Sequence, residues 1–146
     1  MKRAGFTMIE LIFVIVILGI LAAVAIPKLA ATRTDAQVSK ISTEAATLVS
    51  ELGTFYTAQG TFKGKDTADI TNISLKTADN DLQNNDTIVL GDDNNNTCLE
   101  IKFNNVDDGN ITVSADNASG TVCTAVKEAT ADLQKTYNFG GSNVAY

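Results

Sequence analysis

Histidine is absent from this 146-residue chain, and cysteine occurs only twice. Histidine is the most common general base in enzymes, so its absence removes the usual centre of acid–base catalysis. Without histidine, two cysteines alone are a poor ligand set for zinc. There is also no nucleophile motif and no glycine-rich phosphate loop, since the glycines are isolated or terminal. These absences predict a protein that is not an enzyme and that holds neither a cofactor nor a metal ion.

Positive charge is scarce as well. The chain has 11 Lys and Arg residues against 17 Asp and Glu residues, which gives a net charge of −6. An acidic chain without a basic cluster does not favour nucleic-acid binding, and we expect no nucleic-acid partner. The length suits one domain of ordinary size. The hydrophobic fraction of 45% overstates the core of that domain, because much of it lies in the first 26 residues.

An apolar run begins close to the N-terminus. From Leu11 to Ile26 no side chain is polar. With the residues from Phe6 onward in front of it, the run reaches the ~20 residues that a transmembrane helix needs. Lys2 and Arg3 precede the run, and the positive-inside rule places them on the cytoplasmic side. The sequence therefore predicts one membrane-spanning helix near the N-terminus.

One acidic residue, Glu10, lies near the start of this run. A carboxylate in hydrocarbon costs roughly 2.5–3.5 kcal/mol on insertion scales, so a chain that keeps one there usually provides a partner for it. A secretory signal peptide, cut near residues 22–25, is one alternative, and a plain membrane anchor is another. Glu10 and the length of the run argue against the signal peptide, and a plain anchor has no use for Glu10.

Residues 2–11, with the sequence KRAGFTMIEL, resemble the class III signal of type IV prepilins and type II secretion pseudopilins. The resemblance covers roughly residues 1–35. It implies that a prepilin peptidase cuts after Gly5, that the same enzyme N-methylates Phe6, and that the apolar segment is kept as the assembly helix. The implied partners are this peptidase, an inner-membrane assembly platform, the lipid bilayer before assembly, and identical subunits in a helical filament.

The chemistry of this motif can also be argued from its residues. Glycine at position 5 presents no side chain that would hinder a peptidase at the next bond. Cleavage would expose a cationic amine at Phe6, one helical turn before Glu10. In a bundle of such helices, the amine of an incoming subunit can neutralise the Glu10 of a neighbour, whereas an unpaired buried charge costs several kcal/mol. We therefore expect Phe6 and Glu10 to set the register of assembly.

The helix is predicted to continue past the membrane, from about residue 6 to about residue 56. Gly53 and Gly60 are its candidate stop signals. Gly19 and Pro27 interrupt it, and Pro27 predicts a kink because it removes one backbone hydrogen bond. The interruption is either a tolerated kink or, as the resemblance implies, a section that loses helicity in the filament. An apolar stripe with helical spacing follows: Val38, Ile41, Ala45, Leu48, Leu52 and Phe55.

The rest of the chain has the composition of a small β-sheet domain. Residues 57–85 are low in apolar content and predict a long connection, to which residues 70–75 could add a short strand. The predicted strands are residues 87–90, 98–103 and 111–115. A short helix is predicted to follow them at residues 122–133. An antiparallel meander would cover the apolar stripe of the long helix. The predicted fold is therefore α+β and pilin-like: one long N-terminal helix (about 6–56) packed on a small antiparallel sheet, with a short C-terminal helix.

We expect three parts in this chain: a leader at residues 1–5, a transmembrane half-helix at residues 6–29, and a periplasmic head at residues 30–146. Because the periplasm favours disulfides, Cys98 and Cys123 are expected to pair. Their loop of about 25 residues would stabilise the head by about 3 kcal/mol in the chain-entropy treatment. The pair resembles the C-terminal disulfide of many type IV pilins, and two free thiols are the alternative.

Two further patterns lie in polar turns. The turn at residues 92–96 has oxygen ligands typical of calcium sites, but it lacks the glycine and the distal glutamate of an EF-hand loop, so a solvated turn is the simpler interpretation. Asn95 and Asn110 each begin an Asn-x-Thr sequon, with an aspartate two residues before it, which matches the acidic acceptor pattern of bacterial oligosaccharyl transfer. Both are candidates for glycosylation, although chance matches are expected in a chain rich in Asn and Thr. The short sequon alone occurs at Asn72, Asn85 and Asn117.

These observations predict a structural subunit of a type IV pilus-like filament. It would be a single-pass precursor in a bacterial inner membrane, and then part of an extracellular pilus or a periplasmic pseudopilus. The first alternative is a major-type pseudopilin of a type II secretion system. Such proteins usually lack the disulfide and carry a calcium-binding C-terminal loop, so Cys98 and Cys123 favour the pilin. A more remote alternative is a membrane-anchored periplasmic binding module, which would tolerate Glu10→Leu.

Overall fold

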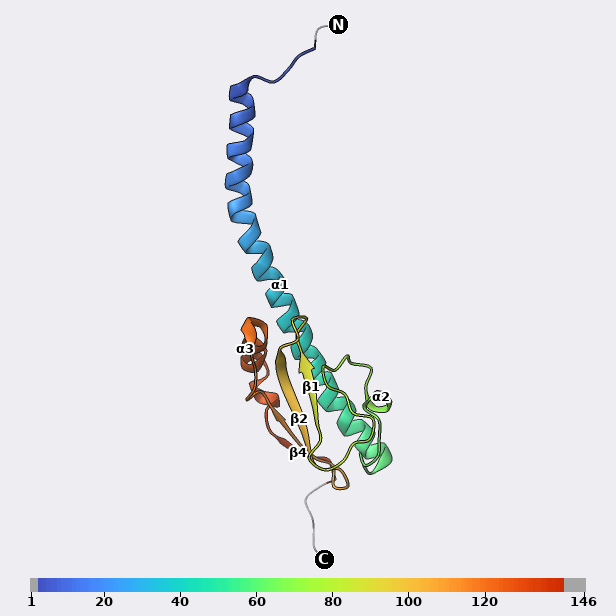
Figure 1. Ribbon diagram of the computed structural model, residues 1–146. Coiled ribbons are helices and arrows are strands. Elements are labelled where there is room, and N and C mark those ends of the chain that lie inside the picture. The colour runs from blue at the N-terminus through green and yellow to red at the C-terminus, as the bar shows by residue number, and fades with distance from the viewer. Residues whose placement is uncertain (1–2, 141–146) are drawn as a thin grey trace, which may run out of the picture. The chain divides into compact units, whose positions relative to one another are not determined.

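The computed structural model describes residues 3–140 (Figure 1). Part of the predicted leader, including Lys2, and the last six residues lie outside this range. The chain divides into two units, Met1–Asp35 and Ala36–Tyr146. Helix α1 (Met8–Gln59) contributes to both of them. The elements that follow are α2 (Thr67–Ile70), β1 (Thr87–Gly91), β2 (Thr97–Asn105), β3 (Asn110–Ser114), α3 (Gly120–Ala129), the 3₁₀ helix η1 (Ala131–Leu133) and β4 (Thr136–Asn138).

In the first unit, α1 is apolar on all sides. The large apolar side chains between Phe6 and Leu29 are all exposed, from 40% to 91% of their surface. One 18-residue window of α1 has a mean hydropathy of 3.1, and none of it is buried. By length and composition, α1 could therefore cross a membrane. The helix is continuous across Gly19 and Pro27, and the kink predicted at Pro27 stays a prediction.

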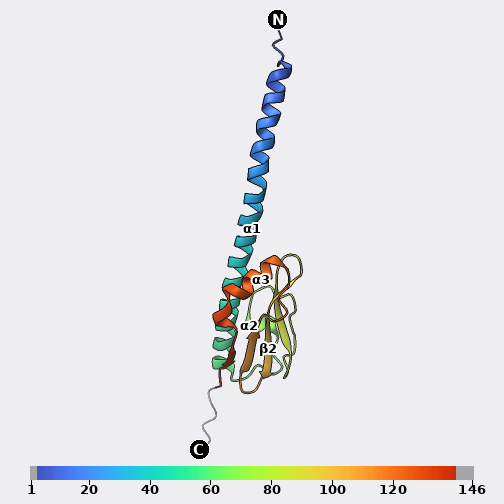
Figure 2. The ribbon, with the colours of Figure 1, turned by 90° about the vertical axis from the view of Figure 1, so that its left-hand side faces the viewer.

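In the second unit, α1 buries one face against the sheet (Figures 1 and 2). Of the predicted stripe, Ile41, Ala45, Leu48 and Leu52 are buried, and Val38 and Phe55 are partly buried. Val49 and Tyr56 are buried as well, although the predicted stripe omitted them. A helix that faces a core commonly buries an apolar stripe at least 100° wide, which explains why two further residues join it.

The end of α1 shows which of the two predicted stop signals is used. The helix passes through Gly53 and ends at Gln59. Gly60 follows with a φ of +75°, and its N–H donates to the carbonyl of Tyr56 at 2.7 Å. A left-handed glycine after the last turn is a common helix terminus. Gly53 instead serves packing, since a Cβ there would lie 3.0 Å from the Phe139 ring.

The sheet is a four-stranded antiparallel meander with the order β1-β2-β3-β4. The three predicted strands are present with slightly different ends, and the α+β, pilin-like fold class is confirmed. The short strand considered at residues 70–75 was wrong: Ile70 ends α2, and the nearest pairing is an isolated bridge between Thr77 and Val89. The edge strand β4 was not predicted, because three residues are too few to show an alternating pattern.

The C-terminal helix is shorter than the predicted residues 122–133. Helix α3 ends at Ala129, and η1 follows as a separate turn. Thr130 lies between them, and both its N–H and its hydroxyl bond to the carbonyl of Val126, at 2.9 Å and 2.7 Å. This double contact closes the last turn of α3 at Thr130, where a threonine side chain competes for backbone groups.

Aromatic rings gather at one end of the sheet. Tyr56 and Phe62 stand at its centre with a centroid separation of 5.3 Å, and the Tyr56 hydroxyl donates to the carbonyl of Asp107 at 2.7 Å. Together with the sheet, these rings hold the C-terminal end of α1. The cluster contains every aromatic residue between positions 36 and 140: Phe55, Tyr56, Phe62, Phe103, Tyr137 and Phe139.

Candidate functional site

The start of α1 is a capping box made by Thr7 and Glu10. The Glu10 Oε2 atom accepts hydrogen bonds from the Thr7 N–H at 2.7 Å and from the Thr7 hydroxyl at 2.8 Å. In return, the Glu10 N–H donates to Thr7 Oγ1 at 3.3 Å. This reciprocal pattern satisfies backbone donors that have no partner inside the helix. It also sets the first helical residue at Met8, two residues after the predicted start at Phe6.

Thr7 is a residue that the sequence analysis missed. The pattern Thr-x-x-Glu before an apolar run is a known signature of a helix N-terminus, so the signal was present at residues 7–10. The prediction instead placed Phe6 inside the helix, one turn before Glu10. In the structure Phe6 lies outside the helix and is 91% exposed. The pairing of its amine with Glu10 stays a prediction.

The charge of Glu10 has no ionic partner among residues 3–140. Its two hydrogen bonds to Thr7 share Oε2, and within the same residues Oε1 accepts none. In hydrocarbon, hydrogen bonds from the chain take the place of water, but they do not neutralise a charge. The capping box therefore gives hydrogen bonds to the Oε2 atom of Glu10 and leaves the Oε1 atom able to accept one from a cation.

Gly5 and Gly19 have no structural role within their own unit. A Cβ atom built at either position would meet nothing within 4 Å, and neither residue has a left-handed backbone. A glycine inside a helix costs roughly 0.5–1 kcal/mol relative to alanine, so Gly19 lowers the stability of the isolated helix. Contacts among residues 3–140 therefore do not require glycine at these two positions.

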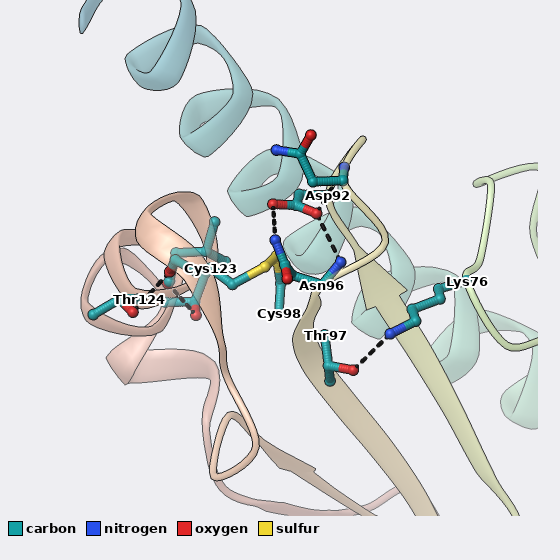
Figure 3. The surroundings of a disulfide bond; sticks show 11 residues. Lys76, Asp92, Asn96, Thr97, Cys98, Cys123 and Thr124 are labelled. Carbon is teal, nitrogen blue, oxygen red and sulfur yellow. Dashed lines mark hydrogen bonds between the residues drawn. A yellow bond between two sulfur atoms is a disulfide. The ribbon is translucent and has the colours of Figure 1, made fainter.

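Cys98 of β2 and Cys123 of α3 form a disulfide, with their Sγ atoms 1.95 Å apart (Figure 3). Both residues are completely buried. The bond fastens α3 to the sheet beside the turn between β1 and β2. The structure thus pairs the two cysteines that the sequence analysis expected to pair.

The turn between β1 and β2 is organised by Asp92. Its Oδ1 accepts from the N–H groups of Asn94 and Asn96, at 3.0 Å and 2.8 Å, and its Oδ2 accepts from Asn96 Nδ2 at 2.9 Å (Figure 3). Partial burial alone would raise the pKa of Asp92, but the donors of Asn96 and Asn94 and the nearby charge of Lys76 outweigh it and lower the pKa below 3.8. Both carboxylate oxygens of Asp92 are thus occupied by the chain's own donors.

The predicted glycosylation residues lie in different settings. Asn95 stands in the exposed turn between β1 and β2, whereas Asn110 is the first residue of β3. Within residues 3–140, no three His, Cys, Asp or Glu side chains come together as a metal site.

A groove of about 580 Å³ runs along the exposed face of α1 in the second unit. Its two charged residues, Lys40 and Glu44, face each other at 3.7 Å. The other residues in its lining are small, uncharged or apolar: Ala36, Ser39, Thr43, Thr47 and Ile73. This lining supplies binding surface but no recognisable catalytic constellation.

A comparison with protein families supports the assignment of the N-terminal segment. Residues 1–26 match the family described as the prokaryotic N-terminal methylation motif. No curated protein and no solved structure matches the chain. The motif points to a structural subunit rather than an enzyme, and it implies processing by a prepilin peptidase and filament assembly. With the apolar helix that follows, it fits a membrane-anchored precursor, and the chain carries the class III signal of type IV pilins and pseudopilins.

Proposed function

We propose that this protein is a structural subunit of a type IV pilus-like filament. In this proposal the precursor waits in the inner membrane with its head in the periplasm, is cut after Gly5, is N-methylated at Phe6, and polymerises through the apolar half of α1. The observation that carries the proposal is that no residue in the apolar window of that half-helix is buried, in the segment that matches the methylation motif. A helix that is apolar all round needs lipid or other helices as its surroundings.

Glu10 provides the specificity that apolar contacts lack. Cleavage after Gly5 creates a cationic amine at Phe6, and the free Oε1 of a neighbouring Glu10 can accept it. A wrong stagger between subunits would leave both charges unpaired in an apolar bundle, which costs several kcal/mol. Identical subunits that repeat such a head-to-tail contact build an open helix rather than a closed ring.

The environment of Gly5 supports its role in cleavage. The residue lies in a non-helical segment before Met8, and the surrounding structure leaves room for a side chain. The fold therefore does not need glycine at this position. A peptidase that must accept the residue before the cleaved bond does need an unhindered one.

A pseudopilin of a type II secretion system is the second candidate, because the methylation motif is shared by both classes. The disulfide between Cys98 and Cys123 favours the pilin, since the resemblance associates such a bond with pilins. The occupied oxygens of Asp92 also give no support to a calcium loop of the pseudopilin kind at this turn.

Intact mass and N-terminal sequencing of protein sheared from cell surfaces would test the proposal. A chain that begins at N-methyl-Phe6, carries the disulfide and is recovered in a sheared high-molecular-weight fraction is the result expected of a pilin. The same processed chain confined to the membrane fraction would favour the pseudopilin. An uncut chain in every fraction would contradict both.

A further inference from the structure

We propose that Asn95 is the acceptor of an N-linked glycan and that Asn110, which has the same sequence pattern, is not. The two sequons are alike in sequence: Asp93 stands two residues before Asn95, and Asp108 stands two residues before Asn110. The structure separates them by access. The inference rests on the proposed function in one respect, the export of the head to the compartment where bacterial oligosaccharyl transfer takes place.

Asn95 is presented to solvent at the turn between β1 and β2. The residue is exposed, its φ is +63°, and its N–H donates to the carbonyl of Asp92 at 3.1 Å. Within residues 3–140 its carboxamide makes no hydrogen bond, so both the oxygen and the nitrogen of the amide remain open. An acceptor asparagine must offer that nitrogen to the enzyme, and exposed loops are where sequons are used.

Asn110 begins β3, and its side chain makes two exposed hydrogen bonds at that end of the sheet. Its Oδ1 accepts from Asn104 Nδ2 at 2.7 Å, and its Nδ2 donates to Asn138 Oδ1 on the edge strand β4. The residue also pairs with Asn105 of β2 and with Asn138 of β4. The amide nitrogen that would receive a sugar is thus engaged, and freeing it would disrupt contacts across three strands.

The side chains of Asp93 and Thr97 are held by surface contacts, whereas Asn96, which lies between Asn95 and Thr97, bonds to Asp92. The Asp93 carboxylate accepts from Gln37 Nε2 at 2.5 Å, and the Thr97 hydroxyl accepts from Lys76 Nζ at 3.0 Å. Both contacts are exposed, so water competes for the same donors and acceptors. A transferase that takes up the acid, the asparagine and the threonine must therefore open this turn together with its Asp92 contacts, while the disulfide beside it keeps the sheet and α3 together.

The reaction needs a donor, which would be an oligosaccharide on a polyprenyl diphosphate. The carboxamide nitrogen of Asn95 forms a C–N bond to the anomeric carbon of the sugar, and the C–O bond between that carbon and the diphosphate breaks. The polyprenyl diphosphate leaves with the electron pair, and the amide proton passes to a base of the transferase.

Asn85 is a control that the chain itself provides. It is exposed, its φ is +74°, and its carboxamide makes no hydrogen bond with the described residues. It also begins a sequon, since Thr87 follows two residues later, but Gln83 stands where Asn95 has Asp93. Asparagine is common in left-handed backbone for steric reasons, and that explanation applies equally to Asn85 and Asn95. Modification of Asn95 alone would therefore require the acid as well as the exposure.

The test is intact mass and peptide mapping of the full chain from its native cells. We expect a glycan on the tryptic peptide that ends at Lys102, which contains both Asn85 and Asn95, and none on the following peptide, which contains Asn110. Asn95→Gln and Asp93→Asn should each abolish the added mass. Asn85→Gln and Asn110→Gln should leave it unchanged, and Asp93→Asn keeps both the acceptor and the shape of the turn.

An unmodified Asn95 in the wild-type chain would overturn the inference, and so would a glycan that survives Asn95→Gln. The same spectra report whether the chain begins at N-methyl-Phe6. A processed chain without a glycan would contradict this inference alone, whereas an unprocessed chain would contradict the proposed function.

Discussion

The two halves of α1 differ in what covers their apolar side chains. In the first unit, no part of the apolar window of the helix is buried by the rest of the chain. In the second unit, Ile41, Leu48 and Leu52 are covered by the sheet and are at most 4% exposed. The second half is thus covered by the sheet, whereas the apolar window of the first half is covered by none of the described residues. Substitutions should therefore affect assembly in the first half and folding in the second.

The largest expected effect concerns Glu10. Glu10→Leu removes the only charge between Met8 and Pro27, so membrane insertion and folding of the head should be retained while filaments are lost. A penalty of several kcal/mol for unpaired charges corresponds to at least about a hundredfold fewer filaments. Filament counts by electron microscopy, with shear fractions, would measure it. Glu44→Gln is the matched control in the second half, and normal filament numbers with Glu10→Leu would contradict the amine–carboxylate pairing.

The disulfide should give the largest effect on folding. Replacing Cys98 and Cys123 by serine together should lower the free energy of unfolding of the head by about 3 kcal/mol, because the unfolded chain loses its cross-link. Denaturant unfolding of the full chain in detergent, followed by near-ultraviolet signals of the aromatic cluster, would measure this. The helicity of the first half of α1 should not change. Equal stability of the variant and the wild type would show that the bond is not formed in the isolated protein.

Two glycine substitutions, one in each unit, would compare the packing of the two units through smaller changes in stability. At Gly109 the φ is +63° and a Cβ would lie 2.6 Å from the Tyr56 ring, so Gly109→Ala should destabilise the head by about 1–3 kcal/mol. At Gly19 a Cβ meets nothing, so Gly19→Ala should leave the monomer unchanged or raise helix stability by about 0.5–1 kcal/mol. Thermal unfolding of both variants in detergent would compare them. The opposite order would mean that the first half also packs within the monomer.

The smallest effect should be the pH dependence contributed by Asp92. Its pKa is lowered in the folded state, so its stabilising contribution is present above the unfolded value of 3.8 and is lost as the pH falls through the lower folded pKa. Acidification from about pH 5 to below 3.8 should lower the free energy of unfolding of the wild-type head more than that of the Asp92→Asn variant. Urea unfolding at several pH values would show this difference. Parallel curves for the two proteins would contradict it.

Much of the fold could be predicted because its signals are local. The three longer strands, the meander and the extent of the long helix follow from alternation, helical spacing and turn residues that lie next to each other in the chain. The errors lie where an element has too few residues to show a pattern, or where a side-chain contact ends it early. The edge strand β4 has only three residues, and the helix expected at residues 122–133 is divided at Thr130 by a side-chain contact with the preceding turn.

The candidate site was predicted in part for the same reason. Gly5, Phe6 and Glu10 belong to one continuous motif, and their roles in cleavage, methylation and assembly stay predictions. Thr7 was missed although its pattern with Glu10 was present, because the predicted helix began at Phe6 and so placed Thr7 inside it. The difference between Asn95 and Asn110 could not be found from sequence, since Asn110 is held by Asn104 and Asn138, which are distant along the chain or on another strand.

The sequence by itself determined the N-terminal signal, the apolar span and the only two cysteines that could pair. Each of these depends on residue types in a short stretch or on a simple count. The tertiary structure decided which residues close the core around Tyr56, which of the two sequons preceded by aspartate lies in an exposed turn, and where the oxygens of Asp92 point. These features depend on side chains brought together from separate strands and helices, and such contacts arise only when burial of the whole apolar face selects one packing.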